Sequence, residues 1–173
     1  ENANAALLVT LNPADFPDSS PLGGMYWQRQ IEQAAFRAGG SNYRAPAQLV
    51  GDFLKKQPSQ ALGAVQPAYR PGVTLCELHE VLPERITSVL EQALPELDKR
   101  LHGFARPDAV LTAPETRSSS PVRILRDETR QSSLRGLYPC GEGVGYAGGI
   151  TSAALDGMLT AEAIINELSN LKG

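Results

Sequence analysis

A cluster of glycines directly before a long helical segment constrains the fold of this chain more than any other feature. The five glycines at positions 141, 143, 145, 148 and 149 are separated by only a few residues. Because glycine has no Cβ, such a cluster removes side chains where another group must come close to the backbone. We expect a short strand over Gly136–Cys140, a loop over Gly141–Gly149 and a helix from about Ile150 to Leu171.

The start of this predicted helix offers hydrogen-bond donors. The first N–H groups of a helix have no intrahelical partner, and the helix dipole gives that end a partial positive charge. Thr151 and Ser152 add hydroxyl groups within the first turn. The combination predicts a site for an anion or an electron-rich acceptor. The alternative interpretation of the glycine loop is a tight strand-to-helix turn packed against a sheet. Gly157, in the middle of the predicted helix, is expected to pack closely against a strand.

Gly143, Gly145 and Gly148 also match the G-x-G-x-x-G pattern of dinucleotide-binding folds. That fingerprint needs a second strand after the helix, with an acidic residue that holds the ribose. The chain ends at Gly173 before any such strand, and Glu167 falls within the predicted helix. The three glycines therefore do not indicate a complete dinucleotide-binding unit.

The remaining pattern predicts an α+β fold, with a small mixed sheet and packed helices followed by the strand–glycine loop–helix segment. An apolar run predicts a buried strand over Ala6–Leu11. Ala109–Thr112 and Val122–Leu125 are predicted to be two strands of one sheet. The predicted helices are Gly24–Ala38, which ends at Gly39-Gly40, Pro46–Lys56, and Pro83–Leu101, and a helical turn is predicted over Cys76–Leu82. Pro95 is expected to kink or divide the last of these helices. Residues 57–74 are predicted to form an extended loop.

Composition narrows the possible functions. The net charge is −3 and aromatic residues make up 6% of the chain, so neither nucleic acid nor an anionic membrane is an expected partner. No apolar run approaches the roughly 18 residues of a membrane span. The two cysteines, Cys76 and Cys140, do not form a disulfide framework, and we expect a cytoplasmic protein with free thiols. Cys140 is predicted to be a buried strand thiol.

The sequence predicts no metal centre and identifies no catalytic residue. Cys76 and His79 lie three residues apart, but two ligands do not make a zinc site. The segment with Arg117, Ser118–Ser120 and Arg123 could line a substrate or flavin pocket, or could be a polar turn. With two histidines in the chain, no Ser-His-Asp arrangement can be proposed.

The tail resembles the C-terminal FAD-contacting motif of two-domain flavoproteins, in particular a family of bacterial FAD-dependent dehydrogenases. The resemblance is carried by GLYPCGEG at 136–143, GYAGGITSA at 145–153 and Asp156-Gly157. The strings ETRSSSPVR at 115–123 and PLGGM at 21–25 are similar to the same family.

The resemblance implies that this chain contributes the flavin-ring side of an FAD site. Residues 1–135 would be a substrate or accessory region and residues 136–173 the FAD-contacting segment, while the N-terminal dinucleotide-binding half is expected to be the missing partner. Glu142 would bind ribityl hydroxyls or, through water, a phosphate, and the N–H groups of Gly149, Ile150 and Thr151 would face the pyrimidine edge of the flavin. The implied cofactor-binding residues are Gly141, Glu142, Gly143, Gly148, Gly149, Ile150 and Thr151.

We therefore expect a fragment of an FAD-dependent oxidoreductase that is inactive and binds FAD poorly alone. The substrate, the electron donor and the electron acceptor are not readable from the sequence. Two alternatives stay open: a self-standing module that binds an anion, a nucleotide or a protein without catalysis, and a scaffold domain without a ligand. An apolar stripe on the last helix is expected to pack on the rest of the chain or to drive self-association. Its residues are Ile150, Ala154, Met158, Ala161, Ile165 and Leu168.

Overall fold

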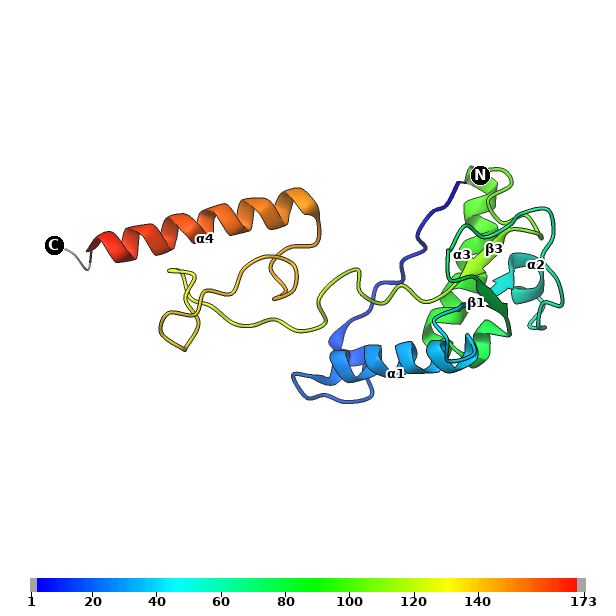
Figure 1. The fold of residues 1–173 in the computed structure, drawn as a ribbon, viewed down its shortest axis with the longest axis horizontal. Coiled ribbons are helices and arrows are strands. Elements are labelled where there is room, and N and C mark those ends of the chain that lie inside the picture. The colour runs from blue at the N-terminus through cyan, green and yellow to red at the C-terminus, as the bar shows by residue number, and fades with distance from the viewer. Residues whose placement is uncertain (1–2, 171–173) are drawn as a thin grey trace. The chain divides into compact units, whose positions relative to one another are not determined.

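The computed structural model describes residues 3–170 and divides the chain into two compact units. Unit 1 comprises Glu1–Asp15 and Trp27–Glu115, and unit 2 comprises Phe16–Tyr26 and Thr116–Gly173. Helix α1 (Gly23–Ala38) therefore contributes its first residues to unit 2 and the remainder to unit 1. Figure 1 traces the helices and strands, which together form the predicted α+β fold.

Unit 1 is built around a three-stranded mixed sheet with the order β2-β1-β3. The central strand β1 (Ala45–Leu49) runs parallel to β2 (Val73–Leu75) and antiparallel to β3 (Val110–Thr112). The helical elements of this unit, besides most of α1, are η1 (Pro13–Asp15), α2 (Val50–Phe53), η2 (Leu78–Glu80) and α3 (Glu84–Arg100).

The core of unit 1 lies where the sheet meets these helices. Its buried apolar side chains are Trp27, Ile31, Ala35, Ala47, Val50, Phe53, Leu78, Val81, Leu82 and Leu94. Gln48 is fully buried among them, so its amide needs hydrogen-bond partners. Its Nε2 donates to the carbonyl of Gln57 at 2.8 Å, and its Oε1 accepts from the N–H of Leu78 at 2.8 Å. These two bonds join β1 to two segments that follow it in the chain, one after α2 and one at η2.

Two predictions for the first part of unit 1 are wrong. The segment Pro46–Lys56 was expected to be one helix, but most of its first residues belong to β1 and only Val50–Phe53 is helical. Pairing on both edges of β1 outweighs the local helix pattern. The apolar run Ala6–Leu11 forms no strand, because it pairs with no described strand, and Leu8 is exposed.

The other predicted elements of unit 1 are confirmed. Helix α1 ends at Ala38, and the N–H of Gly39 bonds to Ala35, as the glycine pair predicts. Helix α3 is also present, but it is continuous through Pro95, so the expectation that this proline divides the helix is wrong. The turn around Leu78 and strand β3 are present, and the predicted loop over residues 57–74 is irregular until β2 begins at Val73.

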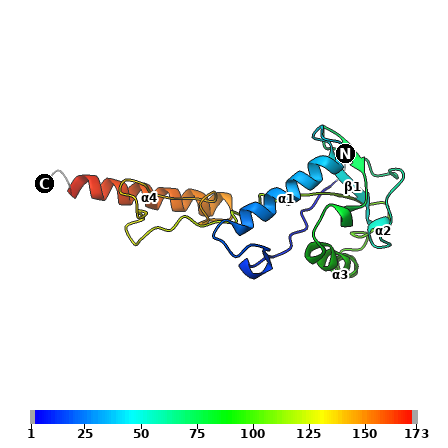
Figure 2. The same ribbon diagram turned by 90° about the horizontal axis from the view of Figure 1, so that it is seen from below.

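Unit 2 contains the long helix α4 (Ile150–Asn170) and a coil that runs along it, as Figures 1 and 2 show. The helix begins where predicted, while Leu171 lies outside the described residues. The predicted strands Val122–Leu125 and Gly136–Cys140 are both irregular. A strand needs a neighbour for its backbone groups, and the described part of unit 2 contains no strand to pair with.

Candidate functional site: the glycine loop and the start of helix α4

Two of the loop glycines are required by the loop's own geometry. Gly141 and Gly145 have positive φ angles of 81° and 84°, which other residues rarely adopt. The loop closes through the N–H of Gly145, which bonds to Glu142 at 2.9 Å, and the N–H of Tyr146, which bonds to Gly141 at 3.1 Å. A Cβ on Gly145 would also lie 2.7 Å from the carbonyl oxygen of Val122.

The other glycines of the loop have no such internal requirement. A Cβ on Gly143 or Gly148 would meet no atom of the described chain within 4 Å, and one on Gly149 would meet only Ser152 Oγ at 3.7 Å. The backbone at these positions is open to an approaching group. Gly157 is likewise open, so its predicted close packing against a strand is wrong.

The start of α4 presents backbone donors without partners in the described chain. Within residues 3–170, no hydrogen bond is found from the N–H groups of Gly149, Ile150 and Thr151. The first bond of the helix is donated by Ala153 to Gly149 at 2.9 Å. Ile150 is 93% exposed, so its side chain covers none of these donors by packing inward. The donors are therefore available to a ligand with electron-rich acceptor atoms.

Glu142 lies on the same loop and is partly exposed. Its carboxylate forms no ion pair or side-chain hydrogen bond with any residue in the described range 3–170. An unpaired carboxylate beside open backbone is chemically able to accept hydrogen bonds from hydroxyl groups. The structure thus places Glu142 in the same loop as the other predicted site residues.

The segment that precedes the loop in the chain supports it from one side. Ser120 Oγ donates to the carbonyls of Val122 at 2.8 Å and Gly143 at 3.2 Å. Arg123 Nε donates to the carbonyl of Gly145 at 2.9 Å, and the N–H of Ile124 bonds to Val144 at 3.2 Å. In this structure, Ser120 and Arg123 hold loop carbonyls in place.

An ion cluster ties the loop to α4. The carboxylate of Asp156 accepts two hydrogen bonds from Arg126, one from Arg130 and one from the N–H of Gly141. The guanidinium of Arg126 also lies 3.7 Å from the centre of the Tyr146 ring, a cation–π arrangement. Asp156 and Tyr146 belong to the motif that carries the family resemblance, but neither was assigned a role, and Arg126 and Arg130 were not among the predicted site residues.

A second polar cluster lies in unit 1. His79 Nδ1 is 2.5 Å from Glu77 Oε1, and His79 Nε2 is 2.7 Å from Glu91 Oε1. The ring stacks on Phe53 with centroids 4.4 Å apart, and Lys56 pairs with Glu91 at 3.1 Å. In the described residues, no group of three or more His, Cys, Asp or Glu side chains could hold a metal ion. We interpret this cluster as a link between η2 and α3.

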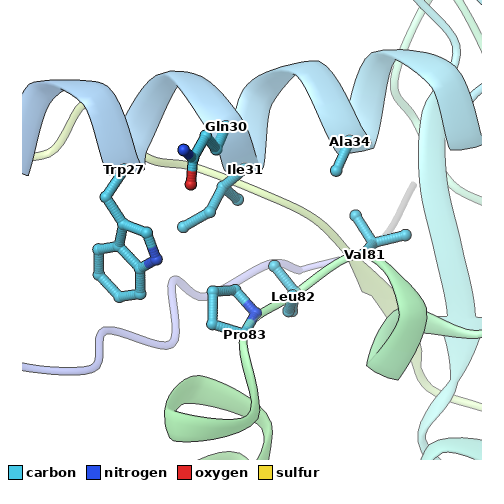
Figure 3. A pocket seen from close by; sticks show the side chains of 7 residues that line it. All are labelled: Trp27, Gln30, Ile31, Ala34, Val81, Leu82 and Pro83. Atoms are coloured by element: carbon cyan, nitrogen blue, oxygen red, sulfur yellow. The ribbon is translucent and has the colours of Figure 1, made fainter. Parts of the chain in front are cut away.

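Unit 1 also has a shallow apolar pocket of about 260 Å³ (Figure 3). Figure 3 shows side chains of α1 facing the segment that joins η2 to α3. The lining residues are Trp27, Gln30, Ile31, Ala34, Val81, Leu82 and Pro83, none of which is charged. The pocket therefore offers apolar contact but no group for acid–base chemistry.

Two further observations bear on the sequence predictions. Cys140 is exposed and lies in irregular structure, so its prediction as a buried strand thiol is wrong. Among the described helices, none is both long enough and apolar enough to cross a membrane.

Comparison with known proteins defines the class of this chain. Residues 1–118 match the family described as FAD-dependent protein, C-terminal domain-like. The chain belongs to this family. The predicted site residues at 141–151 lie beyond the matched residues, so their assignment as FAD contacts stays a prediction.

The chain is also similar to an uncharacterized protein from Clostridium beijerinckii. The two sequences are 51% identical over 168 residues, which cover 96% of this chain and 32% of that protein. The chain thus spans about a third of the length of the relative, and the similarity includes both units.

Proposed function

We propose that this chain supplies the substrate-domain region and the flavin-ring side of the cofactor site in an FAD-dependent oxidoreductase. The family match supports an FAD-dependent parent protein. The observation that carries the proposal is the set of partnerless N–H groups at Gly149, Ile150 and Thr151, beside glycines that no described neighbour requires.

The residues present fit the cofactor in their chemistry. The pyrimidine edge of a flavin carries carbonyl oxygens and a ring nitrogen, which accept hydrogen bonds from backbone N–H groups. The positive end of the α4 dipole lies at the same place, where it favours negative charge. When bound, FAD supplies the capacity to accept a hydride, which protein side chains lack. Glu142 would accept hydrogen bonds from the ribityl hydroxyls or reach a phosphate through water.

The roles of the chain's own residues follow from this placement. Gly143, Gly148 and Gly149 leave the backbone open for close approach. Gly141 and Gly145 set the path of the loop through their positive φ angles. The exposed N–H groups at the start of α4 orient the ring and stabilise added negative charge. The chain would act with a dinucleotide-binding region that holds the rest of the cofactor, and the dehydrogenase substrate is unassigned.

Replacing Ile150 by proline tests the proposal at a single backbone N–H group, which proline lacks. Position 150 is the first residue of α4, where proline is well tolerated because its missing N–H has no intrahelical partner. Ile150→Pro in the full-length gene product should weaken FAD binding about tenfold, the cost of losing one backbone hydrogen bond. Isothermal titration of the apoprotein with FAD measures the change.

Ile150→Ala is the matched control. It removes the same exposed side chain but keeps the backbone N–H. The control should bind FAD with wild-type affinity. Equal FAD affinity in the proline and alanine variants would contradict the proposed contact.

A further inference from the structure

Asp156 connects the two parts of the proposed flavin site. Its Oδ2 accepts the N–H of Gly141, the first glycine of the loop, at 2.9 Å. The residue itself lies in the second turn of α4, so its own position follows that of the helix start. One carboxylate therefore sets the distance between the beginning of the loop and the beginning of the helix.

Arg126 holds this carboxylate and the loop together. Its two terminal nitrogens contact the two oxygens of Asp156 at 3.0 Å and 2.6 Å, a bidentate pairing with defined geometry. The same guanidinium donates to the carbonyl of Pro139 at 2.8 Å, just before the loop. The backbone N–H of Arg126 donates to Tyr146 Oη at 3.1 Å, near the other end of the loop.

Arg130 completes the cluster from the helix side. Its Nη1 contacts Asp156 Oδ1 at 2.7 Å and Thr160 Oγ1 at 3.3 Å, and Thr160 is buried on α4. The side chains of Arg126 and Asp156 are only 10% and 12% exposed. Buried charges of this kind are costly unless every partner is present, so the cluster has one favoured arrangement.

The charge state of Asp156 agrees with this arrangement. The hydrogen bonds from Arg126, and after them those from Gly141 and Arg130, hold the pKa of the carboxyl well below its usual range, although burial opposes them. The lowered pKa favours the ionised form of Asp156, the form that accepts the hydrogen bonds described above.

We propose that Asp156 is a positioning residue for the flavin site, because its carboxylate fixes the glycine loop against the start of α4. This inference rests on the proposed function. The inference extends the proposed function because it assigns a role to Asp156, whose carboxylate is fully engaged by other groups of the protein. Asp156 acts through Gly141, Arg126 and the helix start.

The test is Asp156→Asn in the full-length gene product. Asparagine has the same shape but lacks the charge that two arginines require, so the loop should shift relative to the helix. We expect the FAD dissociation constant to rise about tenfold or more. The visible absorption and circular dichroism of the bound flavin should also change, because these report the surroundings of the ring.

Glu167→Gln is the matched control. Glu167 lies on the same helix and accepts hydrogen bonds from Gln131 at 3.0 Å and from the hydroxyl of Tyr138. Its loss should lower the thermal stability of α4 packing while leaving the flavin spectrum and FAD affinity as in the wild type. Arg126→Lys provides a second variant if Asp156→Asn does not fold, because lysine keeps the charge but not the bidentate geometry.

Three results would overturn the inference. Asp156→Asn with wild-type FAD affinity and an unchanged flavin spectrum is the first. The second is Glu167→Gln with the same spectral change as Asp156→Asn at equal loss of stability, and the third is Arg126→Lys with wild-type binding and spectrum. A wild-type protein that binds no FAD would instead contradict the proposed function itself.

Discussion

At the scale of single residues, the glycines of the loop divide into two kinds. Gly145 combines a positive φ with a carbonyl oxygen 2.7 Å from where a Cβ would stand. Gly148 has no positive φ and no neighbour within 4 Å of its Cβ position. The first kind shapes the loop, and the second leaves room for a group that the chain does not itself supply.

This division predicts opposite outcomes for two alanine substitutions. Gly145→Ala should destabilise unit 2 by about 1–3 kcal/mol, because it forces an unfavourable backbone conformation. Gly148→Ala should change stability by less than about 0.5 kcal/mol but weaken FAD binding by the full-length gene product about tenfold. Thermal unfolding and FAD titration of both variants check these expectations. If Gly148→Ala bound FAD like the wild type, the second interpretation would be wrong.

His79 lies between two glutamate side chains of unit 1. Its Nδ1 lies 2.5 Å from Glu77 Oε1 and its Nε2 lies 2.7 Å from Glu91 Oε1, so the ring links the two side chains. The hydrogen bond from His79, with that from Lys56, lowers the pKa of Glu91. The ionised form of Glu91 therefore contributes to the stability of unit 1.

The sign of the pH dependence follows from that lowered pKa. A carboxyl with a depressed pKa stabilises the fold above its unfolded pKa, and the contribution is lost as pH falls through the folded value. Wild-type protein should therefore be more stable than Glu91→Gln at neutral pH, and the difference should shrink as pH falls below about 4.5. Urea unfolding of both proteins between pH 7 and pH 3 measures it. A constant difference across that range would show that the Glu91 charge contributes nothing.

At the scale of elements, α4 buries one of its described side chains, that of Thr160. The predicted apolar stripe is exposed, with Ile150 at 93%, Met158 at 64%, Ile165 at 61% and Leu168 at 55%. A helix that shows so much apolar surface is typical of one that meets a partner. Self-association through α4 stays a prediction, which sedimentation velocity of the chain over a range of concentrations would check.

Local patterns predicted some elements and failed where partners decide the structure. Helices α1 and α3 could be predicted from the sequence because their apolar spacing and their terminal residues both indicate a helix. Strand β1 was not, since Pro46 and Ala47 favour no sheet alone and Gln48 is buried by bonds to Gln57 and Leu78. Pairing partners far along the chain do not appear in a local window.

The same reason separates the two parts of the candidate site. The glycine loop and the start of α4 could be predicted because the spacing of residues in the sequence is enough to indicate them. The cluster around Asp156 was not, because Arg126, Arg130 and Gly141 approach it from irregular segments without a period. The spacing of Arg126 and Arg130, four residues apart, is the feature of the sequence that could have indicated this cluster.

At the scale of the whole molecule, we propose that this chain provides one side of a flavin site. The family match supports an FAD-dependent parent protein, and this chain covers 32% of the relative from Clostridium beijerinckii. Most contacts to the adenine and pyrophosphate would then come from outside residues 1–173. Each unit would still fold around the contacts described above, while cofactor affinity would depend on the longer polypeptide.

FAD titration of the full-length gene product, beside the chain of residues 1–173, tests this claim most directly. We expect the full-length protein to bind one FAD tightly and to show flavin absorbance, and the chain alone to bind FAD weakly. A full-length protein that binds no FAD, or a 173-residue chain that binds it tightly and stoichiometrically, would contradict it.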